Sequence, residues 1–130
     1  MKEHSGALPV ISLFSGAGGL DLAVEKVDSE PLDINAKPSS PYHVAVATDY
    51  DPDTARTFKA NFPGVPNILR DIRQIPTQEL LEAGGMEAGD PALVIGGPPC
   101  TPFSKSGFWL PEKRESRDPN ASLLLSLIHI

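Results

Sequence analysis

The chain has 130 residues, a formal net charge of −6 and one cysteine. This length allows a single hydrophobic core, but a nucleotide-binding α/β fold usually has more strands than the sequence offers. We therefore expect one domain that is incomplete at its carboxyl end. The acidic charge is the wrong sign for a free-standing DNA-binding module, which has a clustered basic face. One cysteine cannot form an internal disulfide, and we find neither a leader pattern nor an apolar run of membrane length, so we expect a cytoplasmic protein outside the membrane.

The first structured segment combines a strand with a glycine-rich turn. We predict a strand at Val10–Phe14, a turn at Ser15–Gly19 and a helix from about Leu20 to Lys26. Glycines in such a turn let the backbone approach a ligand, and the free N–H groups that open the helix favour polar or anionic groups. Asp21 stands where a dinucleotide-binding fingerprint has its third glycine, and its carboxylate would repel a diphosphate but attract an ammonium group. The alternative is a turn that only eases packing of the helix on the strand.

A second strand ends in acidic residues. The segment Asp28–Pro41 is rich in proline, serine and acid and is predicted to be a surface connection to a strand at Tyr42–Thr48. Asp49 follows this strand, where a carboxylate can accept hydrogen bonds from the two hydroxyls of a ribose. Tyr50 is placed to cover an adenine face. Asp51 is expected to cap the next helix.

The third strand is short and also ends in a carboxylate. We predict a helix over residues 53–62, a weak strand at Asn67–Leu69 and a short helix over residues 76–83. Asp71 and Ile72 follow the strand. The Asp71 carboxylate either reaches an adenine amino group or caps the next turn, and the sequence alone leaves both open.

The lone cysteine follows a strand that stops abruptly. The unalternated run Ala92–Ile95 is typical of a parallel strand covered on both faces. Gly96–Gly97 ends it and Pro98–Pro99 stiffens the exit, so Cys100 is expected at the carboxyl end of a central strand, where open α/β sheets bind ligands. A thiol held there suggests an activated nucleophile. The alternative is a small buried hydrophobic residue.

The segment after the cysteine mixes charge with aromatic residues. It has no helical period, so a mobile loop is expected over Thr101–Asn120. Such a loop next to a nucleophile can grip phosphates and exclude water on closure, whereas its acidic residues also allow a merely solvated loop. It contains the basic residues Lys105, Lys113, Arg114 and Arg117, with Phe108 and Trp109 among them.

These motifs together resemble the amino-terminal part of the DNA (cytosine-5)-methyltransferases. The matching stretches, in the family's order, are FSGAGGLD at Phe14–Asp21, Asp49–Asp51, Asp71–Ile72 and GGPPCTPFSKSG at Gly96–Gly107. The resemblance implies an α/β fold: a truncated, Rossmann-like, S-adenosylmethionine-dependent methyltransferase fold with a mostly parallel sheet. Residues 1–130 would be the amino-terminal portion of one cofactor-binding and catalytic domain. The family's later acid, its arginine motif, its target-recognition region and its carboxyl-terminal segment have no counterpart here.

The resemblance also implies the roles of individual residues. S-adenosyl-L-methionine would be the cofactor, double-stranded DNA the partner of the complete protein, and no metal would be needed. Asp49 would hold the ribose, although the family more often has glutamate there, and Tyr50 would pack on adenine, where tryptophan is frequent. Cys100 would be the nucleophile. The other residues implied at the cofactor are Phe14, Gly16, Gly18, Gly19, Leu20 and Asp21 at the methionine half, Asp71 and Ile72 at the adenine edge, and Pro99.

The implied chemistry accounts for a cysteine at this position. Carbon 5 of cytosine is too weak a nucleophile to accept a methyl group directly, so a thiolate adds at carbon 6 of a base flipped out of the duplex. Two other functions stay open at this point. One is a dinucleotide-dependent oxidoreductase domain, and the other is a catalytically silent fragment that only binds the cofactor.

Overall fold

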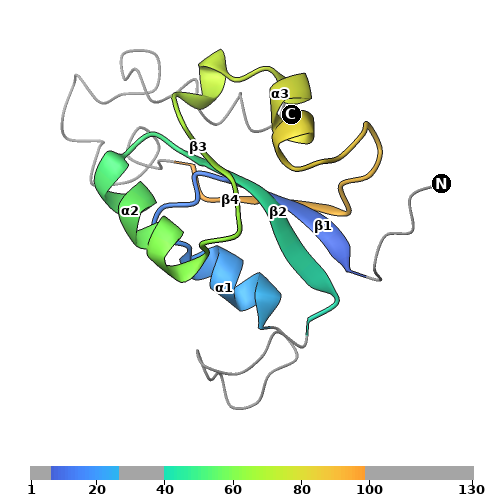
Figure 1. Cartoon of the computed structure of the whole chain (residues 1–130), viewed down its shortest axis with the longest axis horizontal. Coiled ribbons are helices and arrows are strands. Elements are labelled where there is room, and N and C mark those ends of the chain that lie inside the picture. Colours follow the sequence, from blue (N-terminus) through green and yellow to red (C-terminus); the bar gives the residue numbers. More distant parts are fainter. Residues whose placement is uncertain (1–6, 27–39, 99–130) are drawn as a thin grey trace, which may run out of the picture. The chain divides into compact units, whose positions relative to one another are not determined.

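The computed structural model describes residues 7–26 and 40–98, in which strands alternate with helices (Figure 1). This alternation is typical of parallel sheets, because a helix returns the chain to the starting edge after each strand. None of the helices in the described ranges is long and apolar enough to cross a bilayer. The elements are β1 (Leu8–Leu13), α1 (Gly19–Glu25), β2 (Tyr42–Asp49), α2 (Pro52–Asn61), β3 (Asn67–Leu69), the 3-10 turn η1 (Ile72–Gln74), α3 (Thr77–Ala83) and β4 (Leu93–Gly96).

The four described strands form one parallel sheet in the order β3-β2-β1-β4. Leu13 at the end of β1 lies opposite Gly96 at the end of β4, and Asp49 at the end of β2 lies opposite Leu69 at the end of β3. All carboxyl ends therefore meet at one edge, which confirms the predicted mostly parallel α/β sheet. The chain moves outward from β1 to β3 and then returns to the other side of β1, so the order reverses between β1 and β4. Open sheets of this kind bind ligands at such a reversal.

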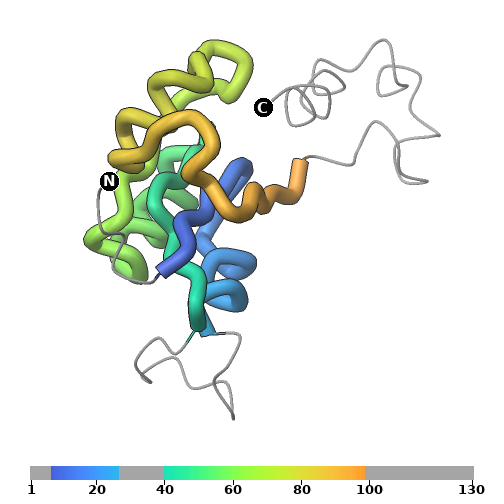
Figure 2. Tube along the Cα trace, turned by 90° about the vertical axis from the view of Figure 1, so that its right-hand side faces the viewer, coloured from blue at the N-terminus to red at the C-terminus, as the bar shows by residue number. Residues whose placement is uncertain are grey.

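Helices cover both faces of the sheet. Ala47 of β2 packs against Phe58 and Phe62 of α2 and its C-cap, with Leu22 of α1 beside them. The neighbouring Val46 points to the opposite face, where it lies 3.4 Å from the position of a β-carbon on Gly84 at the end of α3. Successive strand residues face opposite sides, so α1 and α2 lie on one face and α3 on the other, and both views keep α1 and α3 apart (Figures 1 and 2).

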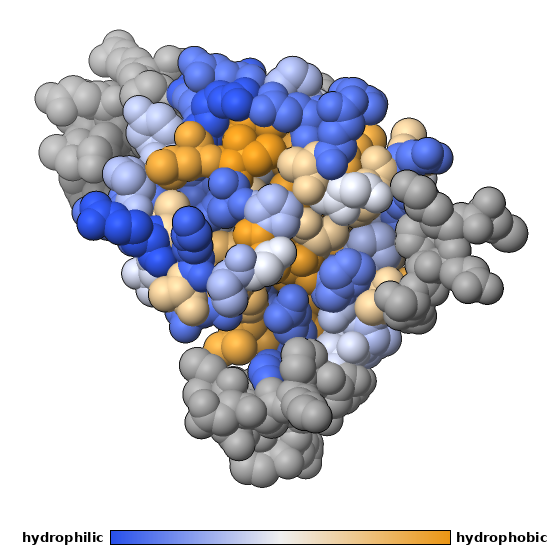
Figure 3. All heavy atoms as spheres, in the orientation of Figure 1, coloured by the Kyte–Doolittle hydropathy of each residue, from blue (hydrophilic) through white to orange (hydrophobic). Residues whose placement is uncertain are grey.

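Local sequence signals explain where the helices begin and what they bury. Asp51 caps α2 as predicted, since its side chain accepts a hydrogen bond from the Asp53 N–H at 2.9 Å and Pro52 follows at the first helical position. The rings of Phe58 and Phe62 stack with their centroids 4.8 Å apart. Polar residues lie along the top of Figure 3, where Figure 1 places η1 and α3, whereas Leu80 of α3 is completely buried.

Strand β4 differs from its prediction. The run Ala92–Ile95 was expected to be covered on both faces, but Leu93 and Val94 are 38% and 43% exposed. The reason is position, because β4 pairs only with β1 and forms an edge of the described sheet. The apolar residues of β4 thus correctly predicted a strand, but they did not predict whether other elements cover its two faces.

Candidate cofactor-binding site

The turn after β1 has an unusual backbone. Phe14, Gly16 and Gly18 all have positive φ angles, of 52°, 55° and 93°. Glycine adopts this left-handed conformation readily, whereas for Phe14 it costs about 1 to 2 kcal/mol. The turn is held against β2 by Ser15, whose N–H and hydroxyl both donate to the Thr48 carbonyl, at 3.0 and 3.1 Å. A strained non-glycine residue at a ligand-binding edge is typical of functional loops.

The three predicted glycines of this turn differ in what a β-carbon would contact at each position. A β-carbon on Gly18 would lie 2.5 Å from Phe62 and 3.0 Å from Phe58, so this glycine lets the turn pack on α2. A β-carbon on Gly16 would make only an ordinary contact, 3.9 Å from the Asp49 carboxylate, and on Gly19 it would meet no described residue within 4 Å. The packing alternative therefore applies to Gly18. Gly16 and Gly19 leave open space in which a ligand can approach the backbone.

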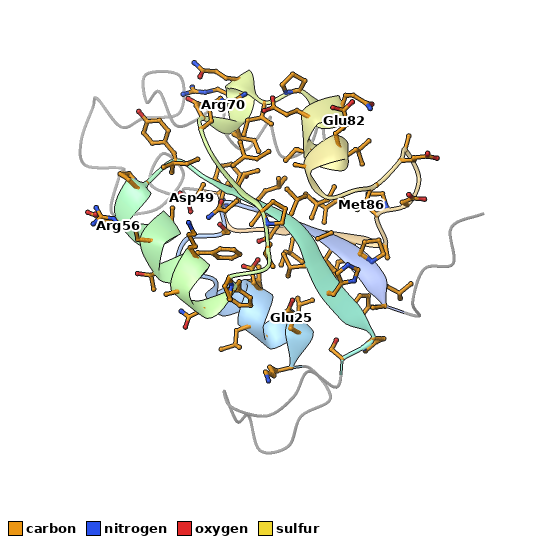
Figure 4. All side chains as sticks on the ribbon, in the orientation of Figure 1. Glu25, Asp49, Arg56, Arg70, Glu82 and Met86 are labelled. Atoms are coloured by element: carbon orange, nitrogen blue, oxygen red, sulfur yellow. The ribbon has the colours of Figure 1, made fainter. Side chains whose placement is uncertain are left out.

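Asp49 connects the end of β2 to this turn. Its carboxylate accepts hydrogen bonds from the backbone N–H groups of Gly16, Tyr50 (2.6 Å) and Asp51 (3.1 Å). A carboxylate has about four acceptor positions, so roughly one remains for a ligand hydroxyl. Tyr50 is 74% exposed beside it. The structure thus places Asp49, the residue predicted to hold the ribose, next to the glycine turn (Figure 4).

Asp71 lies at the end of β3 on the same edge of the sheet. The preceding Arg70 N–H donates to the Asp49 carbonyl at 2.9 Å, which joins the two strand ends. Asp71 caps η1 by accepting from the Arg73 N–H at 2.9 Å, so the capping alternative is confirmed. Hydrogen bonds from the Arg73 side chain lower the pKa of the Asp71 carboxyl. Ile72 follows with its side chain in the core.

Asp21 has a different environment from the other predicted residues. Its side chain is completely buried, and within residues 7–26 and 40–98 neither carboxylate oxygen has a hydrogen-bond partner. Burial raises the pKa of Asp21, an effect that outweighs the nearby Ser12 hydroxyl, which favours the charged form. The structure brings together the turn, Asp49, Tyr50 and Asp71 at the exposed edge but leaves the Asp21 side chain inside. Its contact with the methionine half stays a prediction, as does that of Leu20, which is exposed at the start of α1.

Cys100 and Pro99 lie outside the described residues. The structure does describe the strand end that leads to them, because Gly96 pairs with Leu13 directly before the glycine turn. A shared edge for Cys100 and the turn stays a prediction.

Two features of the site were not predicted from the sequence. One is the left-handed backbone of Phe14, which no residue type at that position signals. The other is Arg73, whose guanidinium binds the Asp71 carboxylate. The signal for Arg73 was an arginine two residues after a capping aspartate, a spacing that lets a long side chain fold back onto the cap.

Comparison with known families identifies the class of protein. A model of the family described as C-5 cytosine-specific DNA methylase matches residues 8–130. The chain therefore belongs to the C-5 cytosine-specific DNA methylases, which confirms the resemblance found in the motifs.

Individual relatives agree with this assignment. The chain is 61% identical over 123 residues to the type II methyltransferase M.SacI of Streptomyces achromogenes, covering 95% of this chain and 31% of that protein. It is 36% identical over 121 residues to the type II methyltransferase M.AquIA of Picosynechococcus, covering 93% and 42%. The chain thus spans less than half the length of these curated relatives.

Solved structures support the fold. A DNA modification methyltransferase encoded within a prophage (E. coli) matches with a TM-score of 0.60 and 25% identity, over 94% of this chain and 28% of that one. A DNMT2 mutant of Spodoptera frugiperda also has a TM-score of 0.60, at 23% identity, over 95% and 31%, a likeness of fold alone. The predicted α/β methyltransferase fold is confirmed.

Proposed function

We propose that a full-length protein carrying this chain transfers a methyl group from S-adenosylmethionine to carbon 5 of cytosine in double-stranded DNA. The observation that carries the proposal is the edge where the glycine turn, Asp49 and Asp71 meet, in a chain of the C-5 cytosine-specific DNA methylase family. Residues 1–130 then form the amino-terminal portion of one cofactor-binding and catalytic domain. The family favours this reaction over dinucleotide-dependent oxidation.

The residues at the edge of the sheet fit the proposed cofactor. Gly16 and Gly19 leave room beside the backbone for the methionine half, and Asp49 keeps about one acceptor position for a ribose hydroxyl. The exposed ring of Tyr50 offers a face for adenine. When bound, S-adenosylmethionine supplies an electrophilic methyl group. The protein's part is to hold it beside the base and to exclude water.

Cys100 is proposed to activate the cytosine. Its thiolate adds to carbon 6 of the flipped base, and the electrons of the 5,6 double bond make carbon 5 nucleophilic. Carbon 5 takes the methyl group as the bond between that group and the sulfonium sulfur breaks, which leaves S-adenosylhomocysteine. A base then removes the proton from carbon 5 and the thiolate leaves carbon 6, which restores the double bond. A thiol suits both steps because it is a good nucleophile near neutral pH and a good leaving group.

The proposal is tested by trapping the covalent adduct. A DNA duplex with 5-fluorocytosine at the target cannot lose a proton from carbon 5, so we expect a stable protein–DNA adduct with a full-length methyltransferase that carries this chain, in the presence of S-adenosylmethionine. Cys100→Ser keeps nearly the same volume but has a far higher pKa, so no adduct should form. Methyl transfer by the Cys100→Ser protein at the unmodified rate would overturn the mechanism. Cofactor binding without any adduct in the unmodified protein would instead favour a silent cofactor-binding module.

A further inference from the structure

Arg73 binds the Asp71 carboxylate with both its side chain and its backbone, at the edge of the sheet proposed to hold the cofactor. Its Nε lies 3.0 Å from Oδ1 and 3.1 Å from Oδ2 of Asp71, and its Nη2 lies 2.5 Å from Oδ2. The Arg73 backbone N–H donates to Oδ1 as well, at 2.9 Å. Three N–H groups of a single residue thus bind the carboxylate. A planar guanidinium fixes the orientation of a carboxylate in a way that a lysine ammonium cannot.

The Asp71 carboxylate can accept few further hydrogen bonds. Three N–H donors, of which the Nε–H is shared between the two oxygens, take about three of its roughly four acceptor positions and leave about one. Arg73 also keeps this carboxyl ionised by lowering its pKa, so the free position can only accept a hydrogen bond. An adenine offers a donor there, its 6-amino group. A 6-oxo purine offers an acceptor and would be repelled.

We propose that Arg73 is a positioning residue that fixes the Asp71 carboxylate as a hydrogen-bond acceptor and so sets the preference of the site for a 6-aminopurine. This inference rests on the proposed function, because Asp71 must face the adenine of the bound cofactor. Arg73 does not act on the reacting atoms. Its effect is on which purine ring binds.

The test compares two ligands that differ at the purine edge. S-adenosylhomocysteine has the 6-amino group, whereas S-inosylhomocysteine has a 6-oxo group. Calorimetry on a full-length methyltransferase carrying this chain should show the adenosyl ligand binding roughly 10- to 100-fold more tightly, the range of one hydrogen bond to a charged group. In Asp71→Ala and Arg73→Gln this preference should fall to a few-fold. Arg73→Lys, which keeps the charge but loses the planar fork, should have an intermediate preference.

Arg70→Gln is the matched control. Arg70 is in the same segment, pairs with Glu79 through two hydrogen bonds of 2.9 and 2.8 Å, and has a side chain 43% exposed, compared with 41% for Arg73. Its loss should cost similar stability and leave the purine preference unchanged. An Arg73→Gln protein that keeps the full preference overturns the inference, and so does one in which Arg70→Gln loses it equally. Should Arg73→Gln fail to fold, the Arg73→Lys ratio decides. Failure of the unmodified protein to bind either ligand would instead refute the proposed cofactor.

Discussion

Gly18→Ala tests most directly whether the turn after β1 needs a glycine at residue 18 in order to pack on α2. Residue 18 has a φ of 93°, so any L side chain there adopts a left-handed conformation at a cost of about 1 to 2 kcal/mol. The new methyl group would also lie 2.5 Å from Phe62 Cε2 and 3.0 Å from Phe58 Cδ2, and overpacking of this kind costs about 1 to 3 kcal/mol. We expect the free energy of unfolding to fall by about 2 to 5 kcal/mol, a large share of the total for a domain.

The assay is urea denaturation followed by far-ultraviolet circular dichroism, with Gly19→Ala as the control. Gly19 has no positive φ and no described neighbour within 4 Å of a β-carbon, so alanine there should leave the midpoint unchanged or slightly higher. A double variant, Gly18→Ala with Phe62→Leu, should recover part of the loss because the clash is shared by the two residues. Equal midpoints for Gly18→Ala and Gly19→Ala would show that neither the φ angle nor the contact with Phe62 requires glycine at residue 18.

Three further changes probe the carboxylates. Asp49→Ala should weaken S-adenosylmethionine binding by about 1 to 3 kcal/mol in a full-length protein, and unchanged affinity in calorimetry would remove Asp49 from the site. Asp51→Ala should lower the free energy of unfolding by about 1 kcal/mol through loss of the α2 cap, whereas Arg56→Ala, which loses only an exposed pair with Asp53, should change it by less than about 0.5 kcal/mol. Because burial raises the pKa of Asp21, the carboxyl stabilises the folded state when it is protonated. This contribution is fully present below the pKa of Asp21 in the unfolded state and is lost as the pH rises through its pKa in the folded state. Thermal melts should therefore show Asp21→Asn gaining stability over the unmodified chain at pH 7.5 but not near pH 4, and a gain of equal size at both values would contradict this.

Much of the backbone could be predicted because its signals are local. Apolar runs bounded by glycine and proline gave β3 at Asn67–Leu69 without error, and placed the other strands within about two residues at either end. The acidic residues at two strand ends and the parallel direction of the strands then implied a common edge, which the parallel pairing of the strands confirms.

Side-chain environment was harder to predict because it depends on neighbours distant in sequence. Gly18 is needed for Phe58 and Phe62, which lie about 40 residues later in the chain, so the turn alone could not show whether packing or a ligand requires it. Asp21 comes early in a helix, where carboxylates are usually solvated, but its position on α1 turns it inward. Likewise, the exposure of Leu93 follows from the place of β4 in the sheet and not from its own residues.

The short side chain of Asp49 is already held in place by three backbone hydrogen bonds. Because the carboxylate is one methylene closer to the backbone than that of a glutamate, it closes a local Asx turn with the N–H groups of Tyr50 and Asp51 while also holding Gly16. Its rotamer is therefore already selected in the free protein, and binding avoids an ordering cost of about 0.5 to 1.5 kcal/mol for this side chain. A glutamate would extend further toward a ribose but would lose that turn. In the proposed site the ribose would therefore lie closer to β2 than with a glutamate, beside a carboxylate that is already fixed in place.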